Sequence, residues 1–185
     1  MFMKTAAYLA VCWVAGTLFA AVAWGKMKNV DPRLSGSGNP GARNAGRLYG
    51  RAGFASVFIM DALKGAAAVL AGRLLGMPEV IAAAGGLMAV AGHAFPLFGR
   101  KGGKGVSTFI GAALAFSPAA FIGFAAGAAA AWLPLRNAVL AMPGGFAAWT
   151  PALLFEGRLE AGWPLLLAAS IVLIRHRPDF KDTFN

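Results

Sequence analysis

Long apolar runs separated by short polar loops dominate this chain. We place the runs at about 5–25, 52–73, 79–98, 106–117, 118–134, 138–155 and 162–175. At about 1.5 Å per helical residue, about 20 residues cross a hydrocarbon core of about 30 Å. The pattern predicts an all-α polytopic membrane protein with about seven transmembrane helices. No loop is long enough to form a second domain, so residues 1–185 are expected to form a single domain.

The region 106–134 allows two interpretations: one long tilted helix, or two short segments that meet near Ser117 and Pro118. Cytoplasmic loops of membrane proteins are enriched in Lys and Arg, so the charges distinguish the two. Two segments with an outside N-terminus leave Lys4, Arg73 and Arg158 outside and place 13 basic residues on the cytoplasmic side, namely Lys26, Lys28, Arg33, Arg43, Arg47, Arg51, Arg100, Lys101, Lys104, Arg136, Arg175, Arg177 and Lys181. With one long helix, all later loops change sides, and the basic residues are divided more evenly between the two sides of the membrane. We therefore predict two segments, an outside N-terminus and a cytoplasmic C-terminus.

The first apolar run resembles a cleavable signal peptide, because Lys4 precedes it and the small residues Ala21 and Ala23 lie near its end. Its extent from Thr5 to Trp24 exceeds the usual apolar region of a signal peptide, which is about 7–15 residues. We expect an uncleaved first helix.

Composition supports a membrane protein and excludes several other classes. Apolar residues make up 58% of the chain and charged residues 13%. The net charge of +10 resides in short loops without a basic helix or zinc-finger spacing, so we expect no nucleic-acid partner. Cys12 has no second cysteine with which to form a disulfide. The two histidines lack a nearby cluster of carboxylates or thiolates, so no metal site is expected.

Two loops predicted on the cytoplasmic side have the composition of anion-binding sites. Ser35–Arg47 reads SGSGNPGARNAGR, which predicts a loop with accessible backbone N–H groups and two arginines. Gly92–Gly105 reads GHAFPLFGRKGGKG and precedes the start of a predicted helix. It is not a P-loop, because Gly105 stands where Ser or Thr would follow the lysine. For each loop the alternative is a flexible turn that obeys the charge rule for cytoplasmic loops.

Charged residues within or beside the apolar runs also bear on function. Asp61 and Lys64 lie three residues apart on one helical face, where they can pair and brace a site. His93 lies at the start of the second loop. The tail from Arg175 to Asp179 is either a third part of the same site or a cap after the last helix.

Motifs for the familiar catalytic centres are missing: there is no Ser-His-Asp spacing, HExxH, CxxC, dinucleotide fingerprint or histidine followed four residues later by aspartate. An enzyme built from this chain would act mainly by binding and orienting phosphate-bearing substrates. Its cations would stabilise the charge that develops during the reaction.

Three stretches resemble the bacterial acyl-phosphate:glycerol-3-phosphate acyltransferases of the PlsY type. They are GSGNPGARNAGR at 36–47, GHAFPLFGRKGGKGVST at 92–108 and IRHRPDF at 174–180, and the DALKG segment at 61–65 is similar as well. The resemblance implies transfer of an acyl chain from acyl phosphate to glycerol 3-phosphate, which yields lysophosphatidic acid and phosphate for phospholipid synthesis. It implies no metal, no cofactor and no acyl-CoA. We expect a bacterial inner-membrane location with the active site on the cytoplasmic face, in agreement with the charge distribution. The oligomeric state is not determined by the sequence, and a monomer is expected.

The resemblance also assigns roles to residues. It implies catalytic positions at Ser37, Arg47, Lys104 and His176, with Arg47 and Lys104 contacting phosphate. It implies substrate binding by Asn39, Asn44 and Lys101, and within the same motifs we also assign substrate binding to Gly38, Arg43, His93, Gly102, Gly103 and Asp179. Structural support is assigned to the pair Asp61 and Lys64.

The chain departs from the family pattern within this same site. Arg43 stands where the pattern has threonine, Asp179 where it has asparagine, and the stretch from His93 to Lys101 is one residue shorter. These changes leave open a divergent or inactive member that binds phosphorylated lipid or uses another acceptor. A transporter of small organic phosphates is a further alternative, although the inverted repeats typical of transporters are not visible.

Overall fold

The computed structural model describes residues 2–97 and 101–184, with side chains up to Phe180. Within these ranges the chain forms nine helices and no strand: α1 (Phe2–Gly16), α2 (Ala20–Lys28), α3 (Ala42–Leu74), α4 (Glu79–Ala94), α5 (Val106–Phe116), α6 (Pro118–Leu135), α7 (Ala138–Phe155), α8 (Leu159–Arg175) and α9 (Arg177–Phe184). The predicted all-α class is confirmed. The predicted end of the third run at Phe98 and the predicted cytoplasmic charges Arg100 and Lys181 lie outside the described residues and side chains.

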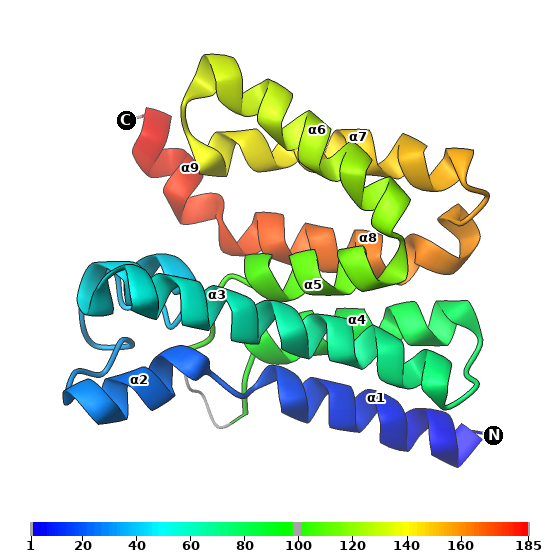
Figure 1. Ribbon diagram of the computed structural model, residues 1–185, viewed down its shortest axis with the longest axis horizontal. Helices are drawn as coiled ribbons and strands as arrows, with labels where there is room; N and C mark the ends of the chain where they lie inside the picture. Colours follow the sequence, from blue (N-terminus) through cyan, green and yellow to red (C-terminus); the bar gives the residue numbers. More distant parts are fainter. Residues whose placement is uncertain (1, 98–100, 185) are drawn as a thin grey trace.

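Helices α1 and α3 to α8 run back and forth between two ends of a bundle, and the chain termini lie at opposite ends (Figure 1). The short helices α2 and α9, the start of α3 and the segment 101–105 lie at the end that carries the C-terminus, which we call the loop end. The turns α3–α4, α5–α6 and α7–α8 lie at the opposite end, with the N-terminus. This arrangement brings both predicted anion-binding loops and the tail together.

Four segments of the described chain are long and apolar enough to cross a membrane: Phe2–Lys28, Ala42–Leu74, Pro118–Leu135 and Ala138–Phe155. Helices α4 and α5 are apolar but shorter, with 16 and 11 residues. The two-segment interpretation of 106–134 agrees with the structure, because α5 ends at Phe116 and α6 begins at Pro118.

The first apolar run, placed at 5–25, lies within one candidate membrane span, Phe2–Lys28, but the helix over it is not continuous. The helix is interrupted between Gly16 and Ala20. The ammonium group of Lys64 donates to the carbonyl oxygens of Gly16 and Leu18, at 3.1 and 2.9 Å. A cation from α3 thus occupies carbonyls that would otherwise continue the helix, and α2 starts in a new direction.

The expectation of a loop throughout Ser35–Arg47 is also wrong, because residues from Ala42 onward form the first turns of α3. Ala42 and Ala45 are buried in a small cluster with Ala21 of α2. Burial of this face outweighs the weak local helix preference of a glycine-rich segment. The helix departs from regular geometry at Gly50, where φ is 76°.

Helices α5, α6 and α7 pack through aromatic side chains, with the Phe109 ring edge-on to Phe146 and Trp149 at centroid distances of 5.1 and 5.3 Å. Helices α3 and α5 approach closely instead, since a Cβ at Gly111 would lie 1.8 Å from the carbonyl oxygen of Ala62. Small residues at such crossings are typical of helix packing in membranes.

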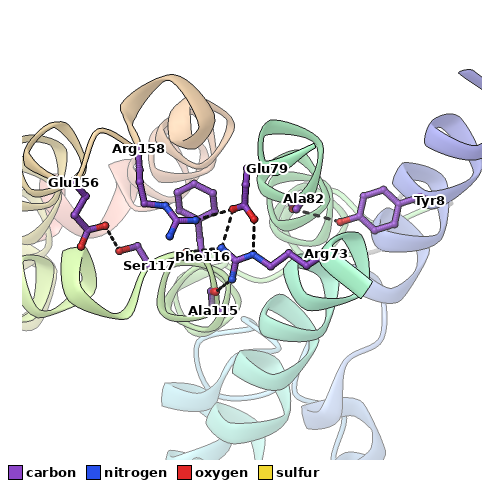
Figure 2. Close-up of polar contacts among 9 residues, drawn as sticks. All are labelled: Tyr8, Arg73, Glu79, Ala82, Ala115, Phe116, Ser117, Glu156 and Arg158. Carbon is purple, nitrogen blue, oxygen red and sulfur yellow. Dashed lines mark hydrogen bonds and ion pairs between the residues drawn. The ribbon is translucent and has the colours of Figure 1, made fainter. Parts of the chain in front are cut away.

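Polar side chains close the short α5–α6 connection at the end opposite the loops (Figure 2). The Arg73 guanidinium donates to the carbonyl oxygens of Ala115 and Phe116, at 2.6 and 2.7 Å. The Ser117 hydroxyl accepts from the Ala120 N–H at 3.0 Å and caps the start of α6. A helix end that would otherwise leave carbonyls unsatisfied is thereby stabilised.

Candidate active site

A cavity of about 580 Å³ is lined in part by residues of the loop end. Its polar part is lined by Ser37, Asn39, Arg43, Arg47, Lys104, His176 and Asp179. Its apolar wall comes from α3, α5, α6 and α7 and includes Phe54, Phe58, Ile110, Phe124, Trp132 and Met142. The combination suits a molecule with an anionic head and a hydrocarbon tail.

Asn44 holds the first loop in place. Its buried side-chain oxygen accepts from the Ser37 N–H at 2.9 Å, and its amide nitrogen donates to the carbonyl oxygens of Pro32 and Ser35, each at 3.0 Å. These bonds fix Ser37 beside the cavity, whereas Asn44 itself does not line it. The geometry makes Asn44 a residue that positions the loop.

Two arginines lie on the first turns of α3, one helical turn apart. Arg43 and Arg47 both line the cavity and are exposed, and neither has a hydrogen-bond or ion-pair partner among the described residues. Gly41, the residue before α3, supplies no side-chain cap to its first N–H groups. The start of α3 therefore offers both main-chain donors and two cations to an anion.

Asn39 presents a further polar atom. Its side-chain oxygen is buried and has no hydrogen-bond partner within the part of the chain that the structure describes. The residue lines the cavity, so a ligand donor there would satisfy an atom that is otherwise left unpaired.

The glycine-lysine segment, residues 101–105, is held against α4. The Gly103 N–H donates to the His93 carbonyl at 2.9 Å, and a Cβ at Gly103 would lie 1.9 Å from His93 Nε2. Arg175 donates to the carbonyl oxygens of Gly102 and Gly103, at 3.0 and 3.2 Å. These contacts aim Lys104 into the cavity.

Asp61, Lys64 and His93 form a buried polar cluster at the cavity. Lys64 pairs with the Asp61 carboxylate at 2.8 Å and lies 2.8 Å from His93 Nδ1. Asp61 and His93 are 2% and 3% exposed, and both line the cavity. The predicted Asp61–Lys64 pair is thus present, and it joins α3 to the end of α4.

The tail provides the third polar group of the site. Lys104 and Asp179 form an ion pair, and Asp179 Oδ2 lies 3.8 Å from His176 Nε2. His176 Nδ1 donates to the Val172 carbonyl at 2.8 Å. Burial lowers the pKa of His176 below its ordinary value of 6.5, so the imidazole is neutral at pH 7.

The structure brings nine predicted residues to one cavity: Ser37, Asn39, Arg43, Arg47, Asp61, His93, Lys104, His176 and Asp179. The other predicted residues, Gly38, Asn44, Lys64, Lys101, Gly102 and Gly103, do not line the cavity. Lys101, for example, is exposed and donates to the Arg33 carbonyl at 3.3 Å. No described group of three or more His, Cys, Asp and Glu side chains could hold a metal ion.

Sequence reasoning missed two contributions to this site. Arg175 braces the glycine-lysine segment, and its place directly before His176 was the available signal. The apolar wall, with Phe58 and Trp132, carries no motif and is visible only once the helices are packed.

The sequence matches known proteins over nearly its whole length. Residues 6–185 match the family model described as glycerol-3-phosphate acyltransferase. A glycerol-3-phosphate acyltransferase of Neisseria meningitidis serogroup C is 38% identical, covering 94% of this chain and 90% of that protein. One from Pseudomonas fluorescens is 37% identical, covering 93% and 92%.

Solved structures agree with the sequence matches. A crystal structure of PlsY (YgiH), an integral membrane glycerol 3-phosphate acyltransferase, in its glycerol 3-phosphate form has a TM-score of 0.86 and 28% identity. The alignment covers 98% of this chain and 92% of that one. The lysophosphatidic acid form of the same enzyme has a TM-score of 0.82. On this evidence of sequence and fold, the chain belongs to the glycerol-3-phosphate acyltransferase family of integral membrane acyltransferases.

Proposed function

We propose that this protein transfers an acyl chain from acyl phosphate to glycerol 3-phosphate, releasing lysophosphatidic acid and inorganic phosphate. The observation that carries the proposal is a single cavity with a cationic end and an apolar wall. Both proposed substrates are phosphate esters or anhydrides, and one also carries a long hydrocarbon chain. The family to which the chain belongs supports glycerol 3-phosphate as the acceptor.

Arg43, Arg47 and Lys104 are proposed to bind the phosphate groups, with the free N–H groups at the start of α3. Because these cations are already in position when the reaction begins, they also stabilise the negative charge that develops on the departing phosphate. Ser37 and Asn39 are proposed to orient the polar part of the substrates. Holding two reactants in the correct geometry supplies much of the rate enhancement in such a site.

The acyl chain is proposed to lie along Phe58, Phe124 and Trp132. These side chains come from α3 and α6, both long enough to cross a membrane. An amphiphile dissolved in the bilayer could enter between the helices without its chain passing through water. This arrangement favours a donor that already resides in the membrane.

We further propose seven membrane spans, an outside N-terminus and an active site on the cytoplasmic face of a bacterial inner membrane. Of the 13 basic residues assigned to the cytoplasm, 11 have described side chains, and the elements that carry them place all 11 at the loop end: Lys26, Lys28, Arg33, Arg43, Arg47, Arg51, Lys101, Lys104, Arg136, Arg175 and Arg177. Their concentration at one end supports that orientation.

Purified protein incubated with acyl phosphate and labelled glycerol 3-phosphate tests the proposal, with acyl-CoA as the alternative donor. We expect labelled lysophosphatidic acid with acyl phosphate and none with acyl-CoA. Product from acyl-CoA alone would overturn the donor assignment. Absence of product from either donor would favour a binding or transport role.

A further inference from the structure

His93 is a buried histidine at the end of α4 that lines the cavity, and the proposed function gives it no role. Its Nδ1 lies 2.8 Å from Nζ of Lys64. Among the described residues, its other ring nitrogen, Nε2, has no hydrogen-bond partner. The atoms around Lys64 determine whether Nε2 offers a ligand a donor or an acceptor.

Lys64 is positively charged in this cluster. Asp61 is 2% exposed, and its Oδ1 lies 2.8 Å from Lys64 Nζ, which compensates the buried carboxylate. The carbonyl oxygens of Gly16 and Leu18 accept from the same ammonium group. An ammonium group has three N–H donors and no acceptor, so its third N–H is donated to His93 Nδ1. Asp61 Oδ1 accordingly has no hydrogen-bond donor in the described part of the chain.

This contact fixes the tautomer of His93. Because the Lys64 ammonium group can only donate, Nδ1 must accept, and the hydrogen of the neutral ring is on Nε2. A hydrogen on Nδ1 would place two donors face to face at 2.8 Å. His176 has the opposite tautomer, since its Nδ1 donates to the Val172 carbonyl. His93 therefore offers the cavity a hydrogen-bond donor.

Gly103 leaves room in front of this donor. A Cβ at residue 103 would lie 1.9 Å from His93 Nε2. The φ of Gly103 is not positive, so the backbone conformation alone does not require glycine there. The missing side chain instead leaves Nε2 uncovered at the cavity wall.

His93 lies between the two parts of the cavity that the proposed function assigns to acyl phosphate. Gly103, beside His93 Nε2, directly precedes Lys104, a proposed phosphate ligand. On the other side, Asp61 Oδ1 is 3.8 Å from His93 Nδ1. Phe58, one helical turn before Asp61, belongs to the apolar wall. In acyl phosphate the carbonyl group joins the phosphate to the hydrocarbon chain, so a donor at this junction can meet the carbonyl oxygen.

We propose that His93 is a catalytic residue whose Nε2–H donates to the carbonyl oxygen of acyl phosphate, and that Lys64 is a positioning residue that fixes the required tautomer. This inference rests on the proposed function and deepens it. Negative charge develops on the carbonyl oxygen when the acceptor hydroxyl adds to the acyl carbon. A donor already in place stabilises that charge more than it stabilises the bound substrate.

His93 keeps its proton throughout the step. The acceptor hydroxyl oxygen forms a bond to the acyl carbon, and the π electron pair of the carbonyl group moves to its oxygen beside Nε2–H. The carbonyl group forms again as the bond from the acyl carbon to the bridging phosphate oxygen breaks, with the electron pair leaving on phosphate. The departing phosphate takes up the hydroxyl proton. Dianionic acyl phosphate and an alcohol thus give the ester and hydrogen phosphate.

A donor analogue that cannot transfer its acyl chain tests this contact without turnover. In a long-chain β-ketophosphonate a methylene group replaces the bridging oxygen, and an alkyl phosphonate of equal length lacks the carbonyl group as well. The wild-type protein should bind the ketone analogue about fivefold more tightly than the alkyl analogue, measured by thermal protection. In infrared difference spectra, the carbon-13-labelled carbonyl stretch should move to lower wavenumber on binding.

Two variants of His93 separate the roles of its ring nitrogens. In His93→Asn the amide oxygen replaces the acceptor for Lys64 and nothing replaces Nε2–H, whereas the longer side chain of His93→Gln carries an amide donor toward the Nε2 position. His93→Asn should bind both analogues equally and leave the carbonyl stretch unshifted. Its kcat should fall about 100-fold, with the KM for glycerol 3-phosphate within about twofold of wild type. His93→Gln should recover about tenfold of that loss.

The positioning role of Lys64 is tested with the double variant Asp61→Asn, Lys64→Met, which avoids leaving a buried carboxylate without its cation. Nitrogen-15 NMR of labelled histidine shows which ring nitrogen carries hydrogen, and the chain has only two histidines. In wild-type protein His93 should show hydrogen on Nε2 alone, and in the double variant on either nitrogen. Lys4→Met is the matched control, because Lys4 donates to the Leu75 carbonyl away from the cavity. It should behave as wild type.

Two results in wild-type protein would overturn the inference, and neither requires a variant to fold. One is hydrogen on Nδ1 of His93, and the other is a carbonyl stretch that does not move when the ketone analogue binds. Unchanged kcat in a folded His93→Asn variant would overturn it as well. Failure of the wild-type protein to use acyl phosphate, with the analogue results as expected, would instead refute the proposed function and leave the hydrogen bond to the carbonyl group established.

Discussion

The two ends of the bundle use the same kinds of charged residue in opposite ways. At the end opposite the loops, Glu79 binds Arg73 at 2.8 Å and Arg158 at 2.7 Å, and both guanidinium groups lie near the Phe116 ring (Figure 2). At the loop end, Arg43 and Arg47 face a cavity without a described partner. At the first end the charged side chains pair with one another, whereas at the loop end the two arginines are available to bind a ligand.

This difference separates stability from activity. Charges that satisfy one another hold helices together, whereas charges directed at a cavity contribute little to folding and are available for a substrate. Variants at the two ends should therefore change different measured quantities.

The largest effect is expected from removing a cation of the cavity. Arg47→Ala or Lys104→Ala should lower the rate of acyl transfer about 100-fold or more, because a charge-assisted contact to phosphate disappears. The melting temperature in detergent should change little. Arg51→Ala, an exposed residue of the same helix that does not line the cavity, is the matched control. Full activity of either cavity variant would refute the site assignment.

A smaller loss of rate is expected from Gly103→Ala. The new methyl group would lie 1.9 Å from His93 Nε2, so the glycine-lysine segment must move and Lys104 moves with it. Displacement of a substrate-binding group by about 1 Å costs up to about 100-fold in rate. We expect a loss of about 10-fold or more, measured in the same transfer assay. Wild-type rates would show that the position of Lys104 does not depend on this contact.

Helices with simple apolar runs were predictable from the sequence, and helices shaped by distant contacts were not. Helix α7 has the predicted bounds, because an uninterrupted apolar run is flanked by polar residues on both sides. The break after α1 depends on Lys64, which lies 46 to 48 residues away in sequence from the carbonyls it binds. The sequence around the end of α1 therefore gives no indication of this contact.

In the candidate site, too, some features were predictable from local sequence and others depend on how the helices pack. Cations and glycines in short motifs predicted Arg47 and Lys104 as site residues, and both line the cavity. The motifs did not distinguish lining residues from supporting ones: Asn44 and Lys101 belong to the same stretches but do not line the cavity. That distinction depends on how α3, α4 and α8 pack.

At the opposite end, Glu79→Gln should lower stability without changing the rate per folded molecule. The substitution removes the charge that Arg73 and Arg158 share. Because Glu79 is 44% exposed at its side chain, we expect only about 1 kcal/mol, or a fall of about 2–4 °C in melting temperature. A loss of activity with unchanged melting would contradict the separation between the two ends.

The smallest effect concerns the pH dependence of stability at the loop end. Burial holds the pKa of His176 below the ordinary 6.5, so the unfolded chain binds a proton more readily than the folded protein does. The stabilising contribution of the neutral ring is therefore complete above about pH 6.5 and is lost as the pH falls below it. Melting temperatures of wild-type protein should decline from pH 7 to pH 5 more steeply than those of His176→Asn. Parallel curves for the two proteins would show that His176 does not titrate differently in the folded and unfolded states, and the neutral imidazole assigned to the site would have to be abandoned.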